Sequence, residues 1–377
     1  MGSQHAMVVR EDGRVDIKSF TQDELASWFA SELGEPPHRA LITYKWLWQR
    51  GATRFDQMDD LAKSTQRKLE KAAYISFLEP HLVLRSTDGT MKFLWRLEDG
   101  RTIESVLIPD GNRMTLCMSS QVGCAMACTF CLTGDLGLKR HLKPSEIANQ
   151  PMQVGQQLPD GTRITNLVLM GMGEPLHNLG NLCDALEICL DDHALNFSHR
   201  KITVSTVGLV PKMAELAARL PVNLAVSLNA STEEQRRQIM PITRKWSVEE
   251  LMQACRDFPL PSGKRITFEY VMFGGINDTL EDADRVLKML EDVPAKLNLI
   301  PYNTNPDRDL MRPSDADVKA FQDHCVAQGM HTTVRTTRGQ DISAACGQLG
   351  KAYEQAVDRG WLEQARLAAG YDGAAVR

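Results

Sequence analysis

Three closely spaced cysteines, Cys124, Cys128 and Cys131, form the pattern C-x-x-x-C-x-x-C. Three such thiolates can each bind one iron of a [4Fe–4S] cluster, which leaves the fourth iron open to a chelating small molecule. A zinc site is the alternative interpretation, but structural zinc motifs usually pair two cysteines with a second, distant pair of ligands. The spacing therefore favours an iron–sulfur cluster with one open coordination position.

The chain contains nine cysteines, an odd number that argues against a disulfide framework and for metal or redox chemistry. Four of them have no metal-like spacing, and we interpret them as core hydrophobes or partly exposed thiols: Cys183, Cys189, Cys255 and Cys325.

The elements that must position the cysteine motif are β-rich runs that alternate with helical segments. Seven such runs occur from residue 113 onward: 114–119, 166–170, 202–206, 222–228, 266–273, 297–302 and 332–336. Strands that alternate with helices pair in parallel, so the pattern predicts an α/β barrel, open or closed, with fewer units than a complete barrel. Polar or glycine-rich residues follow several runs, at the rim where parallel α/β folds bind ligands.

The residues before the barrel predict two smaller units. Apolar positions recur at helical spacing in residues 20–80, which predicts a small helical domain. Within residues 81–112, alternating runs flank the turn sequence EDGR, which predicts a linking β-hairpin. We expect a tag remnant and flexible N-terminus over 1–19, the barrel over 113–350, and a C-terminal helix or tail over 351–377.

The amino-acid composition favours a globular protein without a membrane-spanning segment. The 377 residues are 43% hydrophobic and 24% charged, which is typical of globular proteins. No apolar stretch approaches the ~20 residues that span a bilayer, and no signal-peptide core is evident, so we expect a cytoplasmic protein without membrane contact. The net charge of −5 neither indicates nor excludes nucleic-acid binding.

The cysteine triplet resembles the motif shared by the radical S-adenosylmethionine superfamily. The resemblance implies a partial (β/α)6-type barrel whose [4Fe–4S] cluster cleaves S-adenosylmethionine to a 5′-deoxyadenosyl radical. The rim segments are similar to that superfamily's cofactor contacts, which implies cofactor binding by Gly173, Glu174, Ser205, Ser227, Leu228, Asn229 and Asn303. Taken singly, such residues are more often turn or cap residues, and their common place at strand ends supports the functional interpretation.

Three segments together resemble the RlmN/Cfr family of RNA adenosine methyltransferases: TLCMSSQVGC at 115–124, GMGEPL at 171–176 and DISAACGQL at 341–349. The resemblance runs from about residue 20 to 350. It implies that Cys346 is methylated by one S-adenosylmethionine and that a second generates a radical on this methyl group, which attacks adenine. Cys117 then attacks the Cys346 sulfur, and a disulfide forms as the methylated base leaves.

The same resemblance implies that Glu104 is the proton acceptor of the resolving step. A carboxylate on an alternating strand is otherwise often an ordinary solvated residue. Basic groups that could neutralise RNA phosphates include Lys139–Lys143, His199–Lys201, Arg236, Arg237 and Arg335, although most charge clusters are only solvated faces. The adenosine would have to be single-stranded or flipped out to reach a buried radical.

The family resemblance favours methylation of carbon 2 of adenosine in 23S rRNA and also in tRNA. It implies an external electron donor such as flavodoxin or ferredoxin, and we expect a monomer. Three alternatives stay open: methylation of carbon 8 by the same cysteines, a radical enzyme that modifies a peptide or small molecule, and a zinc-stabilised RNA-binding scaffold.

Overall fold

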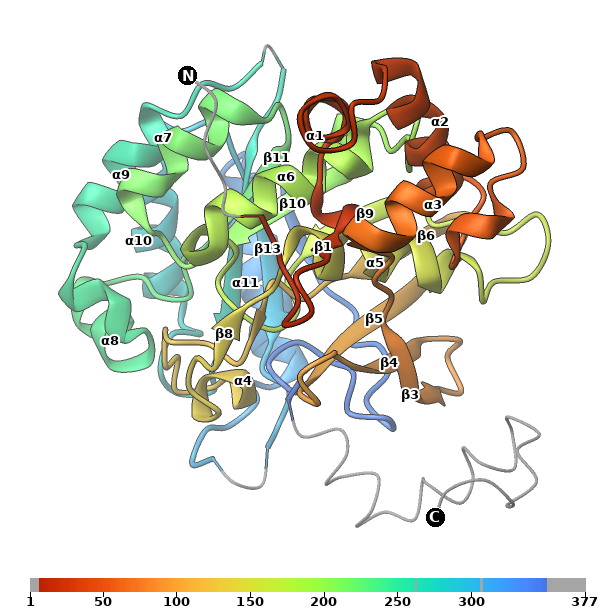
Figure 1. Ribbon diagram of the computed structural model, residues 1–377. Coiled ribbons are helices and arrows are strands. Elements are labelled where there is room, and N and C mark those ends of the chain that lie inside the picture. The colour runs from red at the N-terminus through yellow and green to blue at the C-terminus, as the bar shows by residue number, and fades with distance from the viewer. Residues whose placement is uncertain (1–6, 262, 306–307, 351–377) are drawn as a thin grey trace.

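One mixed sheet of ten strands runs through the computed structural model, which describes residues 7–261, 263–305 and 308–350 (Figure 1). In spatial order the strands are β14 (Thr332–Val334), β13 (Ala295–Pro301), β12 (Ile266–Met272), β11 (Asn223–Ser227), β10 (Ile202–Thr206), β9 (Asn166–Leu169), β6 (Arg113–Cys117), β5 (Thr102–Asp110), β4 (Met91–Arg96) and β3 (Glu79–Arg85). Neighbouring strands from β14 to β6 pair in parallel. This arrangement confirms the predicted partial α/β barrel, with β14 as an additional edge strand.

Helices cover the outer face of the parallel strands (Figure 1). They are α5 (Pro144–Gly155), α6 (Leu179–Leu190), α7 (Val210–Arg219), α8 (Glu233–Ile239), α9 (Val248–Arg256), α10 (Leu280–Leu290) and α11 (Asp315–Ala327). The sequence explains α9 well, because Ser247 and Glu250 form a capping box and the buried residues recur at helical spacing. In the described residues, no helix has the length and apolarity needed to cross a membrane.

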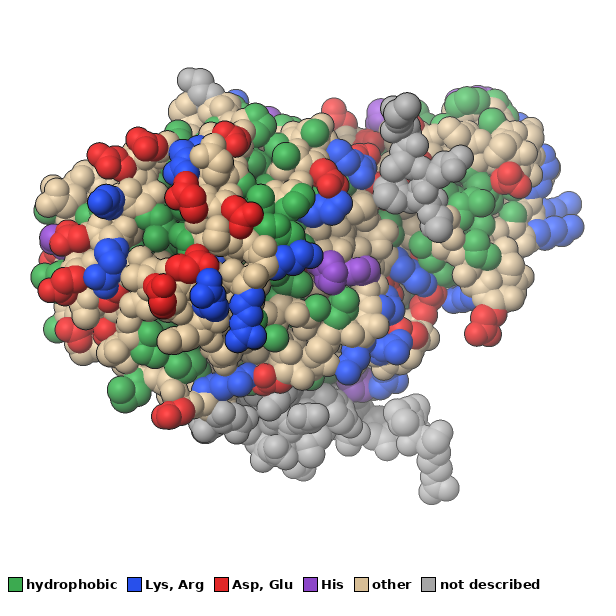
Figure 2. Space-filling model, turned by 90° about the vertical axis from the view of Figure 1, so that its left-hand side faces the viewer, with side chains coloured by type: hydrophobic (Ala, Val, Ile, Leu, Met, Phe, Trp, Pro, Cys, Tyr) green, Lys and Arg blue, Asp and Glu red, His purple; other side chains and the backbone are tan. Residues whose placement is uncertain are grey.

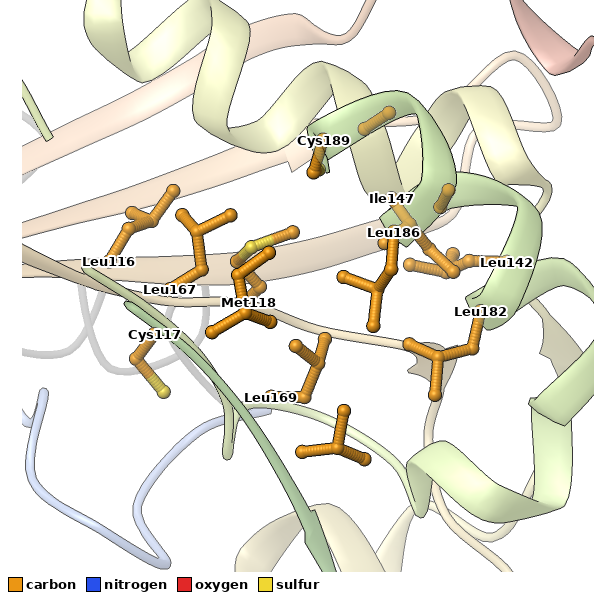
Figure 3. Close-up of a cluster of buried hydrophobic side chains, with 14 of the residues drawn as sticks. Leu116, Cys117, Met118, Leu142, Ile147, Leu167, Leu169, Leu182, Leu186 and Cys189 are labelled. Carbon is orange, nitrogen blue, oxygen red and sulfur yellow. The ribbon is translucent and has the colours of Figure 1, made fainter. Parts of the chain in front are cut away.

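The side chains of β6 alternate between the two faces of the sheet. Leu116 and Met118, which directly follows the strand, pack among residues of α5 and α6, whereas the Cys117 side chain leaves the opposite face of the sheet (Figure 3). Cys189 of α6 belongs to the same core, and Cys183, Cys255 and Cys325 are also buried, as the sequence predicted. The alternation therefore gives Cys117 a different environment from its two neighbours.

The N-terminal helices α1 (Gln22–Trp28), α2 (Pro37–Trp48) and α3 (Lys63–Ala72) lie together beside α5 (Figure 1). The prediction of a flexible segment over 1–19 is wrong for residues 15–19. Here β1 (Val15–Asp16) pairs with β2 (Ala73–Tyr74), and the buried Lys18 ammonium bonds to Asn149 of α5. Residues 1–6 and the expected tail at 351–377 lie outside the described residues.

The predicted hairpin consists of β4 and β5, but it is not a separate linker. It gains a third strand, β3, and β5 pairs with β6, so the three strands continue the barrel sheet. We refer to β3, β4 and β5 with their connections, residues 79–110, as the β-extension. The remaining elements are β7 (Gln121–Val122), β8 (Arg140–His141), α4 (Leu132–Asp135), the π-helical turn Phe29–Leu33 and the 3₁₀ turns Ile17–Ser19, Phe55–Gln57, Pro175–Asn178, His199–Lys201 and Pro241–Arg244.

Candidate active site

A cavity of about 150 Å³ opens where the parallel strands end. Residues from the strand ends, the cysteine motif and the C-terminal loop line it together, among them Cys124, Cys128, Cys131, Gly173, Glu174, Ser205, Ser227, Asn229, Glu269, Arg335 and Cys346. Most of the predicted metal and cofactor residues therefore line one cavity, at the end of the parallel strands where the sequence predicted a ligand site.

The three motif cysteines line one side of this cavity, in the connection between β7 and α4. Burial raises the pKa of Cys124 to about 12 and also raises that of Cys131. A thiol in such an apolar site is poorly reactive by itself and is converted to the thiolate by a bound metal. No three His, Cys, Asp or Glu side chains of the described residues are placed to share a single ion. A [4Fe–4S] cluster makes no such demand, because each thiolate binds a different iron, so this donor set fits the cluster.

The turn after β9 brings Gly173 and Glu174 into the cavity wall, close to Cys124. Gly173 has a φ of 103°, and a Cβ at this position would lie 2.5 Å from the Gln121 side chain. The Gln121 side chain in turn accepts a hydrogen bond from the Glu174 backbone N–H at 2.8 Å. Glycine is therefore required here both by the backbone conformation and by the close packing.

The Glu174 carboxylate is buried at the end of β10. It accepts hydrogen bonds from the Thr206 hydroxyl at 2.7 Å and from the Val207 backbone N–H at 2.9 Å. Burial raises the pKa of Glu174 to about 7, and these hydrogen bonds only partly oppose the shift. A cationic group in the cavity would favour the ionised form, so this carboxylate suits an ammonium ligand.

Ser205, Ser227 and Asn229 reach the cavity from the ends of β10 and β11. Asn229 has a φ of 58°, and its side-chain carbonyl accepts a bond from the Val271 N–H at 2.9 Å. Leu228, which lies between Ser227 and Asn229 in the sequence, was also predicted to bind the cofactor. Its side chain is instead fully buried in the main core and does not line the cavity.

Arg236 was a predicted phosphate contact, and the structure contradicts this. Its guanidinium is buried and donates hydrogen bonds to the carbonyls of Val207, Ser227 and Leu228 at 2.6, 3.1 and 3.1 Å. It thus holds the ends of β10 and β11 together, whereas the adjacent Arg237 is exposed and pairs with Glu233.

Residues 335–350, here called the Cys346 loop, contribute Arg335, Cys346 and Gly347 to the cavity wall. The Leu132 N–H donates to the Gly347 carbonyl at 2.9 Å, and the Thr133 hydroxyl donates to the Leu349 carbonyl at 2.8 Å. Asn303 does not line the cavity and instead donates to the Cys346 carbonyl at 3.3 Å. The loop that carries Cys346 is therefore attached directly to the segment that follows the cysteine motif.

Cys117 and Cys346 approach one another although they are far apart in sequence. Burial raises the pKa of Cys117 to about 12, and the nearby Cys346 adds to this shift while Arg335 opposes it. Cys117 is the last residue of β6, and both thiols are free. The structure thus brings together the two cysteines outside the motif that the sequence singled out.

Glu104 is a buried residue of β5. The alternative interpretation of Glu104 as an ordinary solvated residue is therefore wrong. Its carboxylate pairs with Lys92 at 3.1 Å and accepts a hydrogen bond from the Gly350 N–H at 2.7 Å. Val106 pairs with Cys117 across the strands, and Glu104 is two residues away on the same face.

Two charged residues of the cavity wall, Glu269 and Arg335, were not predicted as catalytic or cofactor residues. Glu269 is a buried carboxylate in β12 whose side chain accepts a bond from Asn298 at 2.7 Å, and burial raises its pKa. The sequence predicted Arg335 only as a phosphate contact. In the structure it lies close enough to Cys346, Glu269 and Cys117 for their charges to raise its pKa. A charged residue within an otherwise apolar strand was the available signal for Glu269.

The surface shows no single field of positive charge on the face formed by α7, α8 and α9. Figure 2 shows basic and acidic side chains interspersed over it. In the predicted cluster 139–143, Arg140 pairs with Glu146 at 2.7 Å and Lys143 with Glu98 at 3.0 Å. Acidic partners therefore neutralise part of the predicted phosphate-binding charge.

Comparison with known proteins gives the family of the chain. Residues 118–290 match the family model described as "Radical SAM superfamily", and residues 15–75 match "Ribosomal RNA large subunit methyltransferase N-terminal domain". The "Dual-specificity RNA methyltransferase RlmN" of Geobacter sulfurreducens is 51% identical over 90% of this chain and 92% of its own. The protein of the same name from Anaeromyxobacter dehalogenans is 48% identical over 91% and 94%.

A solved structure agrees with these relatives. The crystal structure of "a radical SAM methyltransferase from Sphaerobacter thermophilus" superposes with a TM-score of 0.83 at 38% identity and covers 89% of this chain and 98% of that one. The chain therefore belongs to the RlmN family of radical S-adenosylmethionine methyltransferases.

Proposed function

We propose that the protein methylates carbon 2 of an adenosine in 23S rRNA, and also in tRNA, by way of a methyl group carried on Cys346. The observation that carries the proposal is the approach of Cys346 and Cys117 beside the cavity of the cysteine motif. The relatives at about half identity are named as dual-specificity RNA methyltransferases, which supports RNA as the substrate.

The cofactors of this family are a [4Fe–4S] cluster and S-adenosylmethionine. When bound, they supply a methyl group and a carbon radical. Cys124, Cys128 and Cys131 would hold the cluster, and Glu174 would accept hydrogen bonds from the ammonium of the bound cofactor. Ser205, Ser227 and Asn229 would hold its remaining polar groups, with Gly173 leaving room for the backbone turn.

The protein's own residues then carry the transfer. Cys346 accepts the methyl group on its sulfur, and the carbon of this group later forms the bond to the adenine ring after it has lost one hydrogen to the radical. Cys117 gives up its thiol proton and attacks the Cys346 sulfur, so that the sulfur–sulfur bond forms as the bond between Cys346 and the carbon attached to RNA breaks. The released carbon takes up a proton and becomes the methyl group, and the one electron left from the radical stage would return to the cluster. Glu104 accepts the proton from the ring carbon. The partial burial of Cys346 under its loop keeps water away from these reactive stages.

The electron donor, the oligomeric state and the location of the protein complete the proposal. The cluster needs an electron from outside, so we propose an external donor such as flavodoxin or ferredoxin. We also propose that the protein acts as a monomer, in the cytoplasm where its RNA substrates are found.

The test is nucleoside analysis with the anaerobically reconstituted protein. Unmodified 23S rRNA and tRNA transcripts are incubated with S-adenosylmethionine and a reductant, digested and analysed by mass spectrometry. We expect 2-methyladenosine from both RNAs, its loss in Cys346→Ala, and its retention in the control Cys189→Ala, which changes a buried cysteine of α6. Formation of 8-methyladenosine, or methylation that survives Cys346→Ala, would contradict the proposal.

A further inference from the structure

A fully buried ion pair lies next to the two transfer cysteines. The Lys92 ammonium is 3.1 Å from the Glu104 carboxylate, and the two side chains are only 1% and 2% exposed. Burying two charges costs several kcal/mol, and an apolar pair of similar volume is often as stable. A structural role alone therefore gives little reason for placing a lysine inside this sheet.

Both partners of the pair also bond to the Cys346 loop, one on each side of Cys346. The Lys92 ammonium donates to the Ser343 carbonyl at 2.9 Å, and the Glu104 carboxylate accepts from the Gly350 N–H at 2.7 Å. Ser343 has a φ of 51°, a left-handed conformation that a serine keeps only when its surroundings hold it. The ion pair thus spans the base of the loop.

Strand register places the same pair beside Cys117. Lys92 of β4 and Cys117 of β6 both pair with Val106 of β5, from opposite sides. Side chains of directly paired residues lie on one face of a sheet, so the ammonium and the thiol share the face that also carries Glu104.

Further contacts attach the loop to the β-extension. The Asp341 carboxylate accepts bonds from the Ser86 hydroxyl at 2.6 Å and the Thr87 N–H at 3.2 Å. The Asp88 carboxylate accepts from the Gly339 N–H at 2.9 Å. The turn between β3 and β4 therefore holds the start of the loop, and the ion pair holds its middle and end.

We propose that Lys92 is a positioning residue for the resolving step: it compensates the buried Glu104 charge and fixes Glu104 and the Cys346 loop in one arrangement facing Cys117. This inference rests on the proposed function, because it acts through Glu104 as the proton acceptor. It predicts that loss of Lys92 slows release of RNA from Cys346 more than it slows the earlier formation of the RNA–Cys346 bond.

The test compares Lys92→Met with Lys92→Arg in single turnovers on the 23S rRNA transcript. The measured quantity is the ratio of covalent RNA–protein adduct to released 2-methyladenosine. We expect Lys92→Met to raise this ratio on the order of tenfold or more, as for loss of a positioned proton acceptor, and Lys92→Arg to restore most of the wild-type ratio. Lys212→Met, which removes an exposed lysine that pairs with Glu215, serves as the control with a wild-type ratio.

A double variant separates action through Glu104 from a general loss of structure. Lys92→Met combined with Glu104→Gln removes both buried charges, so it also serves if the single variant does not fold. We expect the adduct ratio of the double variant to equal that of Glu104→Gln alone.

A wild-type ratio in folded Lys92→Met, or a further multiplication of the ratio in the double variant, would overturn the inference. Failure of the wild-type protein to methylate RNA would instead overturn the proposed function.

Discussion

At the residue scale, burial gives different roles to side chains of the same type that look equivalent in the sequence. Arg236 and Arg237 are adjacent and were predicted to act alike, yet Arg236 is buried against strand-end carbonyls and Arg237 is exposed. The cysteine motif, in contrast, could be predicted because ligand spacing is a local property of the chain. Roles that depend on what surrounds a side chain, such as those of Glu269 and Lys92, needed the fold.

The two arginines give a matched stability test. We expect Arg236→Met to lower the free energy of unfolding by about 3 kcal/mol, because buried carbonyls lose their donors. Arg237→Met should change it by less than about 0.5 kcal/mol. Urea unfolding of both variants measures this. Equal effects of the two substitutions would show that the strand-end contacts of Arg236 contribute little.

At the element scale, the parallel strands were the most predictable part. Runs such as 202–206 and 266–273 match β10 and β12 within a residue, because both runs are rich in the β-branched and aromatic residues that strands favour. The two-residue strands β1, β2, β7 and β8 could not be predicted, since pairing with another segment defines them and local sequence does not. The continuation of the hairpin into the barrel sheet was missed for the same reason.

The turn after β9 gives a prediction at this scale. Gly173→Ala should lower the free energy of unfolding by about 1 to 3 kcal/mol and weaken S-adenosylmethionine binding, because an added Cβ meets Gln121 in a left-handed backbone. Gly155→Ala at the end of α5 is the control, since a Cβ there has open space. Thermal unfolding and equilibrium binding measure both effects. Wild-type values for Gly173→Ala would contradict the assigned role of this turn.

At the scale of the whole molecule, Lys18 joins the N-terminal helices to the barrel. Its ammonium bonds to Asn149 of α5 and lies 4.3 Å from the centre of the Trp48 ring. Burial lowers the pKa of Lys18 to about 7, an effect that Asp16 only partly opposes. The helical character of the N-terminal region was predicted from the spacing of its apolar residues, but this contact could not be, because it joins residues 131 positions apart.

The lowered pKa makes stability depend on pH. Between about pH 7 and the ordinary lysine pKa of 10.5, the unfolded chain binds a proton that the folded chain does not. Lys18 therefore makes the free energy of unfolding rise with pH in this window, by up to about 1.4 kcal/mol per pH unit. Urea unfolding from pH 7 to 9 should show a smaller rise in Lys18→Met and an unchanged rise in Lys212→Met. Equal slopes in wild type and Lys18→Met would contradict this assignment.

The central claim is that Cys346 carries the transferred carbon and that Cys117 releases it. The most direct test is denaturing electrophoresis and peptide mass spectrometry of reconstituted Cys117→Ala after reaction with the 23S rRNA transcript. We predict RNA linked covalently to Cys346, because the bond to adenine forms but the sulfur that resolves it is missing. Released 2-methyladenosine without any adduct, from a variant with an intact cluster, would contradict the account.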